Sequence, residues 1–191
     1  VNDVLSIMNI VLDKIIPGLT ISIKNHGKII DQNGEYGVQI QLMSLREGMK
    51  EIPLQYESDG IKKIISVLHL LIQMFNTSIT VAIDELDAGI FEYLLGEILH
   101  IIQDHGKGQL IFTSHNLRPL ETLDRCFIAF TTINPENRYT RMYNVKTTNN
   151  LSDLYYRDIM VGSNQNEELY MPTNNSEIAL AFHEAGEFCG A

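Results

Sequence analysis

The sequence has 191 residues, of which 45% are hydrophobic and 20% are charged, and its formal net charge is −10. This composition is typical of a globular protein with a buried core, and it excludes a disordered or fibrous chain. The acidic balance argues against nucleic-acid binding by this segment alone, and the absence of any run of about 18 apolar residues predicts no membrane span.

The first part of the chain predicts a helix followed by a small antiparallel β unit. Apolar residues recur at helical spacing over residues 3–16, and Pro17-Gly18 stops the pattern. Residues 19–23 alternate as in a strand, Asn25-His26-Gly27 resembles a turn, and residues 36–42 alternate again.

The central part alternates between helical patterns and short apolar strands. Helices are predicted over residues 60–75 and 88–104. The run 79–83 is typical of a strand buried on both faces, and 110–113 and 127–131 predict a second and a third buried strand. This order predicts an α/β fold with a parallel sheet.

We expect a single domain with three parts. Residues 1–52 hold the helix and the β unit, 53–133 the α/β core, and 134–191 a C-terminal extension richer in Asn, Thr, Glu and Tyr. Within the extension, peripheral helices are predicted over residues 151–160 and 176–188.

Two consecutive carboxylates, Asp84 and Glu85, directly follow the first central strand. Parallel α/β sheets bind ligands at the carboxyl ends of their strands, where Asp84 can serve Mg²⁺ and Glu85 can deprotonate a water. The alternative is that both acids only begin the next loop and helix, since acids favour helix N-termini.

Three neighbouring features point to phosphate chemistry. Ser58 is suited to cap the helix that begins near Ile61, and Gly60 lets backbone amides approach an anion there; an ordinary capped helix is the alternative. Asp87 lies in a compact acidic turn after Glu85. His115 follows the second central strand and can bind a phosphate, although a lone histidine is more often structural.

The order of these residues closely resembles the C-terminal half of an ABC-type ATPase head, over roughly residues 53–130. The matching residues are those of the signature, Walker B, catalytic glutamate, D-loop and switch: Ser58, Gly60, Asp84, Glu85, Asp87 and His115. Glu57 and Asp59 depart from the commoner Leu-Ser-Gly-Gly signature. The sequences Asp84-Glu85-Leu86-Asp87 and Ser114-His115-Asn116 resemble those of the bacterial ABC-like AAA-type ATPases allied to RecF, OLD and SMC proteins more than those of a transporter subunit.

The resemblance implies a P-loop NTPase core that uses ATP and Mg²⁺. It also implies a homodimer in which two heads close on ATP, with Ser58 and Gly60 reaching the partner's γ-phosphate. Asp84 would hold Mg²⁺, Glu85 would be the general base, His115 would contact the γ-phosphate, and Asp87 would cross the interface.

The P-loop pattern G-x-x-x-x-G-K-[ST] is absent, because neither Gly27-Lys28 nor Gly106-Lys107 fits it. We therefore expect the P-loop strand and helix upstream of Val1, and no tight ATP binding by this chain alone. An effector domain or partner protein is expected for the full-length protein, and nucleic acid is a candidate ligand there.

The two cysteines, Cys126 and Cys189, are far apart and without metal-like spacing, which favours the cytoplasm over a disulfide framework or zinc site.

Two other functions stay open. A metal-dependent nuclease would gather Asp84, Glu85, Asp87 and His115 around divalent ions, but it leaves the Ser58 region unused. A catalytically silent interaction module would keep the fold without turnover. Arg46, which precedes the signature region, is expected close to the nucleotide or the interface.

Overall fold

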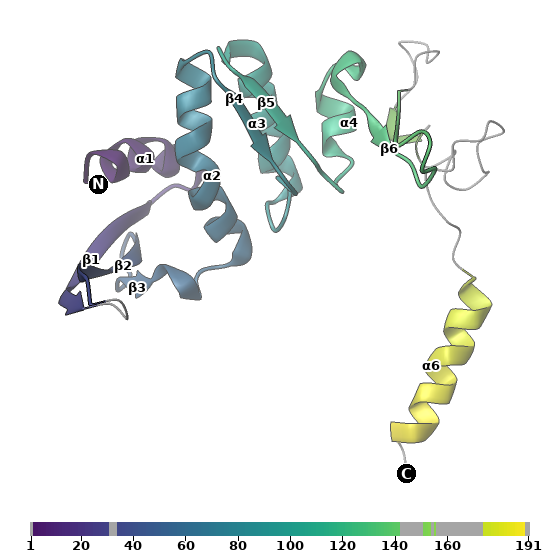
Figure 1. Ribbon diagram of the computed structural model, residues 1–191, viewed down its shortest axis with the longest axis horizontal. Helices are drawn as coiled ribbons and strands as arrows, with labels where there is room; N and C mark the ends of the chain where they lie inside the picture. Colours follow the sequence, from purple (N-terminus) through teal and green to yellow (C-terminus); the bar gives the residue numbers. More distant parts are fainter. Residues whose placement is uncertain (1, 31–33, 142–150, 154, 156–173, 190–191) are drawn as a thin grey trace. The chain divides into compact units, whose positions relative to one another are not determined.

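A computed structural model describes residues 2–30, 34–141, 151–153, 155 and 174–189 (Figure 1). The chain forms two compact units, Val1–Thr122 and Leu123–Ala191. The three-part organisation with boundaries after residues 52 and 133 stays a prediction.

The first unit begins with the predicted helix and antiparallel β unit. Helix α1 spans Asn2–Ile15, β1 spans Leu19–Ile30, β2 spans Tyr36–Arg46, and the short β3 spans Ile52–Pro53. The three strands form one antiparallel sheet in the order β1-β2-β3. Helix α1 is joined to β1 because the Asn9 amide donates to the Ile21 carbonyl at 2.9 Å and accepts from the Ile21 amide at 2.8 Å.

The predicted turn at Asn25-His26-Gly27 is wrong. Strand β1 continues through these residues, and its register against β2 shifts between Asn25 and Gly27, so the structure has a β-bulge there. Gly27 takes a φ of 106°, and its amide donates to the Asn25 side chain at 2.8 Å. Bulges and turns use the same two features: Gly adopts a positive φ, and the Asn side chain accepts a local hydrogen bond. The sequence pattern therefore does not distinguish a bulge from a turn.

The rest of the first unit carries the predicted α/β alternation. The elements, in chain order, are η1 (Leu54–Tyr56), α2 (Asp59–Asn76), β4 (Thr80–Ile83), α3 (Glu92–His105), β5 (Gln109–Phe112) and α4 (Arg118–Thr122). Strands β4 and β5 pair in parallel, with Ile83 opposite Phe112. The predicted mixed α/β fold with a parallel sheet is confirmed.

The prediction that the central strands are buried on both faces is wrong for this unit. Val81 and Ile83 are buried, whereas Ala82 between them is exposed and Ile111 on β5 is 53% exposed. Helix α2 contacts β4, and the apolar core lies on the buried face. A run of β-branched residues does not reveal how many faces are covered, because Ile and Ala also occur on exposed strands. The most deeply buried large side chains of the unit are Leu12, Leu19, Met74, Leu86, Leu95 and Leu99.

In the second unit, the prediction of a third parallel strand over residues 127–131 is wrong. Residues Arg125–Phe127 form the 3₁₀ helix η2, and the short β6 (Phe130–Thr131) pairs antiparallel with β7 (Tyr139–Thr140). The hairpin continues beyond β6, where the Thr132 amide donates to the Arg138 carbonyl at 3.0 Å. A local hairpin partner therefore takes the ladder bonds that the prediction assigned to the parallel sheet.

The predicted C-terminal helix is confirmed as α6, which spans Asn175–Cys189. The helix predicted over residues 151–160 lies partly outside the described residues, although 151–153 and 155 are helical. The Tyr155 ring stacks on Phe130, with centroids 5.3 Å apart and planes inclined by 18°. Across the described residues, no helix combines the length and apolar character that a membrane crossing requires.

Candidate functional site

The ends of the two parallel strands are joined by one side chain, Thr113. Its hydroxyl donates to the carboxylate of Asp84 and accepts from the Glu85 amide at 2.8 Å. Its carbonyl accepts from the Leu86 amide at 3.0 Å. Because Ile83 and Phe112 are paired, the residues after them emerge together at the carboxyl edge of the sheet. The sequence analysis missed Thr113, and the parallel register was the signal that could have identified it.

Glu85 has an unusual backbone conformation. Its φ is 47°, and among the described residues it is the only non-glycine residue with a positive φ. Such strain persists where surrounding bonds over-determine it, and it is frequent at functional sites. The Glu85 side chain is 59% exposed, and its Oε1 lies 3.9 Å from Nε2 of His115, whose side chain is 87% exposed. Both groups are therefore open to a substrate.

Asp87 fixes the segment that leaves β5. Its carboxylate accepts from the His115 amide at 3.2 Å and from the Asn116 amide at 3.0 Å. This bond set lies within one chain and ties the turn after β4 to the segment that carries His115. The structure thus brings together four of the predicted residues: Asp84, Glu85, Asp87 and His115.

The start of α2 carries the other two predicted residues. Ser58 is the N-cap of α2, and its side chain accepts from the Ile61 amide at 3.4 Å. Gly60 is buried, and a Cβ added there would lie 2.0 Å from the carbonyl oxygen of Gly89. The missing side chain of Gly60 therefore permits direct backbone packing between α2 and the turn after Asp87.

A second link joins α2 to the site. The Lys63 ammonium donates to the Asp84 carbonyl at 2.9 Å. Helix α2 thus contacts the carboxylate-bearing turn through the Lys63 side chain and, at Gly60 and Gly89, through backbone.

The described carboxylates at this sheet edge do not form a metal site by themselves. Within the part of the chain that the structure describes, no three His, Cys, Asp or Glu side chains are grouped to hold a metal. Asp84 is exposed, and its Oδ2 makes no hydrogen bond to the described residues. These donors fit Mg²⁺ held by one carboxylate together with phosphate and water, and they give no support to a nuclease centre built from several protein ligands.

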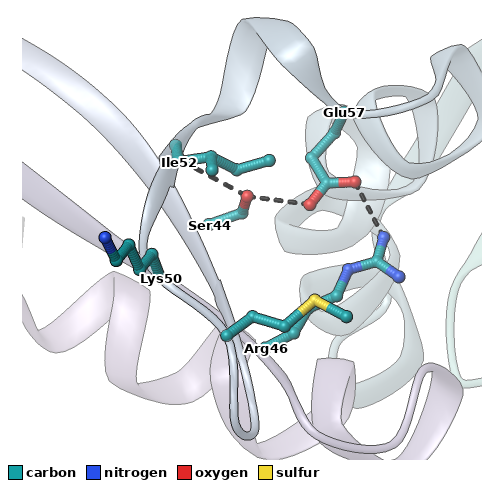
Figure 2. A pocket seen from close by; sticks show the side chains of 6 residues that line it. Ser44, Arg46, Lys50, Ile52 and Glu57 are labelled. Carbon is teal, nitrogen blue, oxygen red and sulfur yellow. Dashed lines mark hydrogen bonds and ion pairs between the residues drawn. The ribbon is translucent and has the colours of Figure 1, made fainter.

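An ion pair between half-exposed Arg46 and buried Glu57 lies immediately before Ser58 (Figure 2). Glu57 accepts from the Ser44 hydroxyl at 2.8 Å and from the Arg46 guanidinium at 2.8 Å, and its side chain is 5% exposed. Burial alone would raise the pKa of Glu57. The hydrogen bonds from Arg46 and Ser44 and the Arg46 charge outweigh burial and lower this pKa below its ordinary value, which keeps the carboxylate charged.

The sequence matches no protein-family model and no curated protein. Solved structures do match. An SMC ATPase studied for ATP-driven dimerisation and DNA-stimulated activation is similar over 81% of this chain and 92% of its own, with a TM-score of 0.55 and 15% identity. The Smc head domain of Pyrococcus yayanosii with a coiled coil and joint is similar over 82% of this chain and 29% of its own, with a TM-score of 0.56 and 14% identity.

A third match is the Smc head domain of Pyrococcus furiosus with an extended coiled coil, bound to the C-terminal domain of ScpA. It is similar over 84% of this chain and 38% of its own, with a TM-score of 0.53 and 13% identity. The chain therefore has the α/β fold of SMC ATPase heads. It spans nearly all of the first match but only 29% and 38% of the two Pyrococcus chains.

Proposed function

We propose that this chain is the C-terminal part of an ATPase head that closes on ATP as a dimer. A P-loop is absent from the printed sequence, so another segment of the full-length protein must supply it. The observation that carries the proposal is the joint placement of Asp84, Glu85 and His115 at one sheet edge by Thr113 and Asp87. The fold shared with SMC heads supports it.

Each residue has a role in this proposal. Glu85 accepts a proton from water while the water oxygen bonds to the γ-phosphorus and the bond to ADP breaks. His115, at 3.9 Å from Glu85, contacts the γ-phosphate. Asp84 is a ligand of Mg²⁺, which when bound neutralises phosphate charge.

The second set of residues acts between heads in this proposal. Ser58 and the start of α2 bind the γ-phosphate held by the partner, because a helix N-terminus favours an anion. Asp87 already binds the His115 and Asn116 amides, so we propose that it braces its own switch segment beside the interface. Its crossing to the partner stays a prediction, as does Gly60 binding to phosphate.

The proposal places the protein in the bacterial branch allied to RecF, OLD and SMC proteins. The residues after each strand, Asp84-Glu85-Leu86-Asp87 and Ser114-His115-Asn116, support this branch over a transporter subunit. A cytoplasmic location and an effector domain or partner protein belong to the same proposal.

The test uses the full-length protein, meaning this chain together with its P-loop segment. Glu85→Gln removes the general base, and we expect a fall in ATP hydrolysis of about 10²–10⁴-fold with ATP binding retained. Glu92→Gln, an exposed change in the first turn of α3, is the control and leaves hydrolysis unchanged. Wild-type turnover by the Glu85 variant would overturn the assignment.

A further inference from the structure

The buried contacts of Glu57 lie beside the residue proposed to read the partner's nucleotide. Figure 2 shows the Glu57 carboxylate between Ser44 and Arg46, both of which belong to β2. Glu57 is the C-cap of η1, and Ser58 is the N-cap of α2. The carboxylate therefore ties the entrance of α2 to the antiparallel sheet.

Burial of the Glu57 carboxylate is a costly way to fill the space. Ser44 is 1% exposed and Glu57 is 8% exposed, whereas the Arg46 side chain is 42% exposed and remains in contact with water. Replacing buried ion pairs by apolar residues of similar size is often neutral or stabilising, so stability alone does not account for such a pair. Hydrogen bonds differ from apolar contacts because they are directional, so they hold the carboxylate at a defined position.

Earlier in the connection, β3 pairs with β2, and the Ser44 hydroxyl also donates to the Ile52 carbonyl at 3.4 Å. The Glu57 amide donates to the Leu54 carbonyl at 3.0 Å within η1, and the Ser58 side chain bonds only forward to the Ile61 amide. Between β3 and α2, Glu57 is thus the residue whose side chain holds the connection to β2. A loss of either bond would free the backbone one residue before Ser58.

We propose that Ser44, Arg46 and Glu57 are positioning residues that set the place of Ser58 for the nucleotide of the partner head. The inference rests on the proposed function. Its consequence is specific: weakening the network impairs the site of the opposite subunit. The contacts that tie α2 to its own acid turn, at Gly60 and Lys63, are separate from the network, so Glu85 and His115 of the same subunit keep their places.

The test is complementation between full-length proteins. Glu57→Gln keeps the shape of the side chain but places an amide NH₂, itself a donor, opposite the donors Ser44 and Arg46. We expect hydrolysis to fall about tenfold, as for loss of one charge-assisted hydrogen bond. The Glu57→Gln protein is then mixed one to one with the Glu85→Gln protein. Each heterodimer contains one site with an intact base from one subunit and an intact signature from the other. We expect about a quarter of the wild-type rate, because half of random dimers are mixed and each has one complete site of two.

A reference mixture separates this inference from the proposed function. Ser58→Ala with Glu85→Gln should complement in the same way. If the reference fails, the signature does not act between subunits, and both proposals fail. If the reference complements while the Glu57→Gln mixture is no more active than the sum of its parts, the positioning role alone is overturned.

Two further variants and one control complete the design. The double variant Arg46→Met with Glu57→Leu replaces the ion pair by apolar packing, so we expect it to unfold like the wild type while its hydrolysis stays reduced; wild-type hydrolysis by this variant would overturn positioning as the role. Ser44→Ala removes the hydroxyl bonds to Glu57 and to the Ile52 carbonyl but leaves the ion pair, so it replaces Glu57→Gln in the mixture if that variant does not fold. Lys50→Met removes a cation from the same pocket and leaves hydrolysis unchanged.

Discussion

The hydroxyl of Thr113, the residue after β5, bonds to the side chain of Asp84 and to the backbone of Glu85, so one oxygen places two consecutive acids. Thr113→Val keeps the shape but removes both bonds. We expect hydrolysis by the full-length protein to fall about tenfold or more, because a hydrogen bond to a charged group is worth roughly 1.5–3 kcal/mol.

The matched variants for Thr113 test the hydroxyl itself. Thr113→Ser retains the donor and acceptor and should restore most of the turnover measured in a steady-state assay. Thr80→Val removes an exposed hydroxyl at the start of β4 and should have no effect. Equal activity of Thr113→Val and Thr113→Ser would contradict a positioning role.

The contact between Gly60 and Gly89 predicts a strong effect of one methyl group. Gly60→Ala would place a Cβ 2.0 Å from the Gly89 carbonyl oxygen, so backbone must shift. We expect a loss of about 1–3 kcal/mol in the free energy of unfolding, measured by denaturant titration. Gly37→Ala on β2 is the control, since its Cβ would meet Ile29 at an ordinary 3.7 Å, and a stable Gly60→Ala protein would contradict the packing.

Glu57 predicts a pH dependence of stability. Its folded-state pKa lies below the ordinary value of 4.5, so its stabilising contribution is present above that pH and is lost as pH falls through the folded pKa. Glu57→Gln should therefore lower the free energy of unfolding near neutral pH by about 1–2 kcal/mol, since half-exposed Arg46 is partly screened.

The measurement for Glu57 is the difference between wild type and variant in chemical denaturation at several pH values. This difference should shrink as the pH is lowered below 4.5. The exposed Glu92→Gln change provides the baseline. A difference that is constant over pH would show that the charge of Glu57 contributes nothing.

The isolated chain should not bind ATP tightly, because the backbone cradle and lysine of a P-loop are absent from its sequence. Calorimetric titration of the 191-residue chain with Mg-ATP should give no heat of micromolar binding. Micromolar affinity would mean that the phosphate site has been misplaced.

Much of the fold could be predicted from sequence because its signals are local. The apolar period over residues 60–75 reappears as α2, Asp59–Asn76, and the two central strands pair in parallel. The exposure of the second sheet face could not be predicted, since it depends on contacts with residues distant in sequence. The antiparallel pairing of β6 with β7 was missed for another reason, because an apolar run does not show whether a strand joins a neighbouring hairpin or a parallel sheet.

The candidate site shows the same division. Asp84 and His115 are visible in the sequence because each follows an apolar run that ends at a sheet edge. Thr113 needs the register between two strands, and the bond between Arg46 and Glu57 needs the chain to return from β3 through η1. The bond between Arg46 and Glu57 explains why an acid occupies the position before Ser58.

The backbone contact between Gly60 and Gly89 has a mechanical consequence for a dimer of two ATPase heads. No side chain lies between these two segments to absorb a displacement, so the first turn of α2 and the loop ahead of α3 must shift together. In the proposed dimer, α2 senses the neighbour's nucleotide while that loop continues from the head's own acids. Engagement of one head would then be transmitted to the other reaction centre as a rigid displacement, so the two sites would close on their nucleotides together although each hydrolyses ATP by itself.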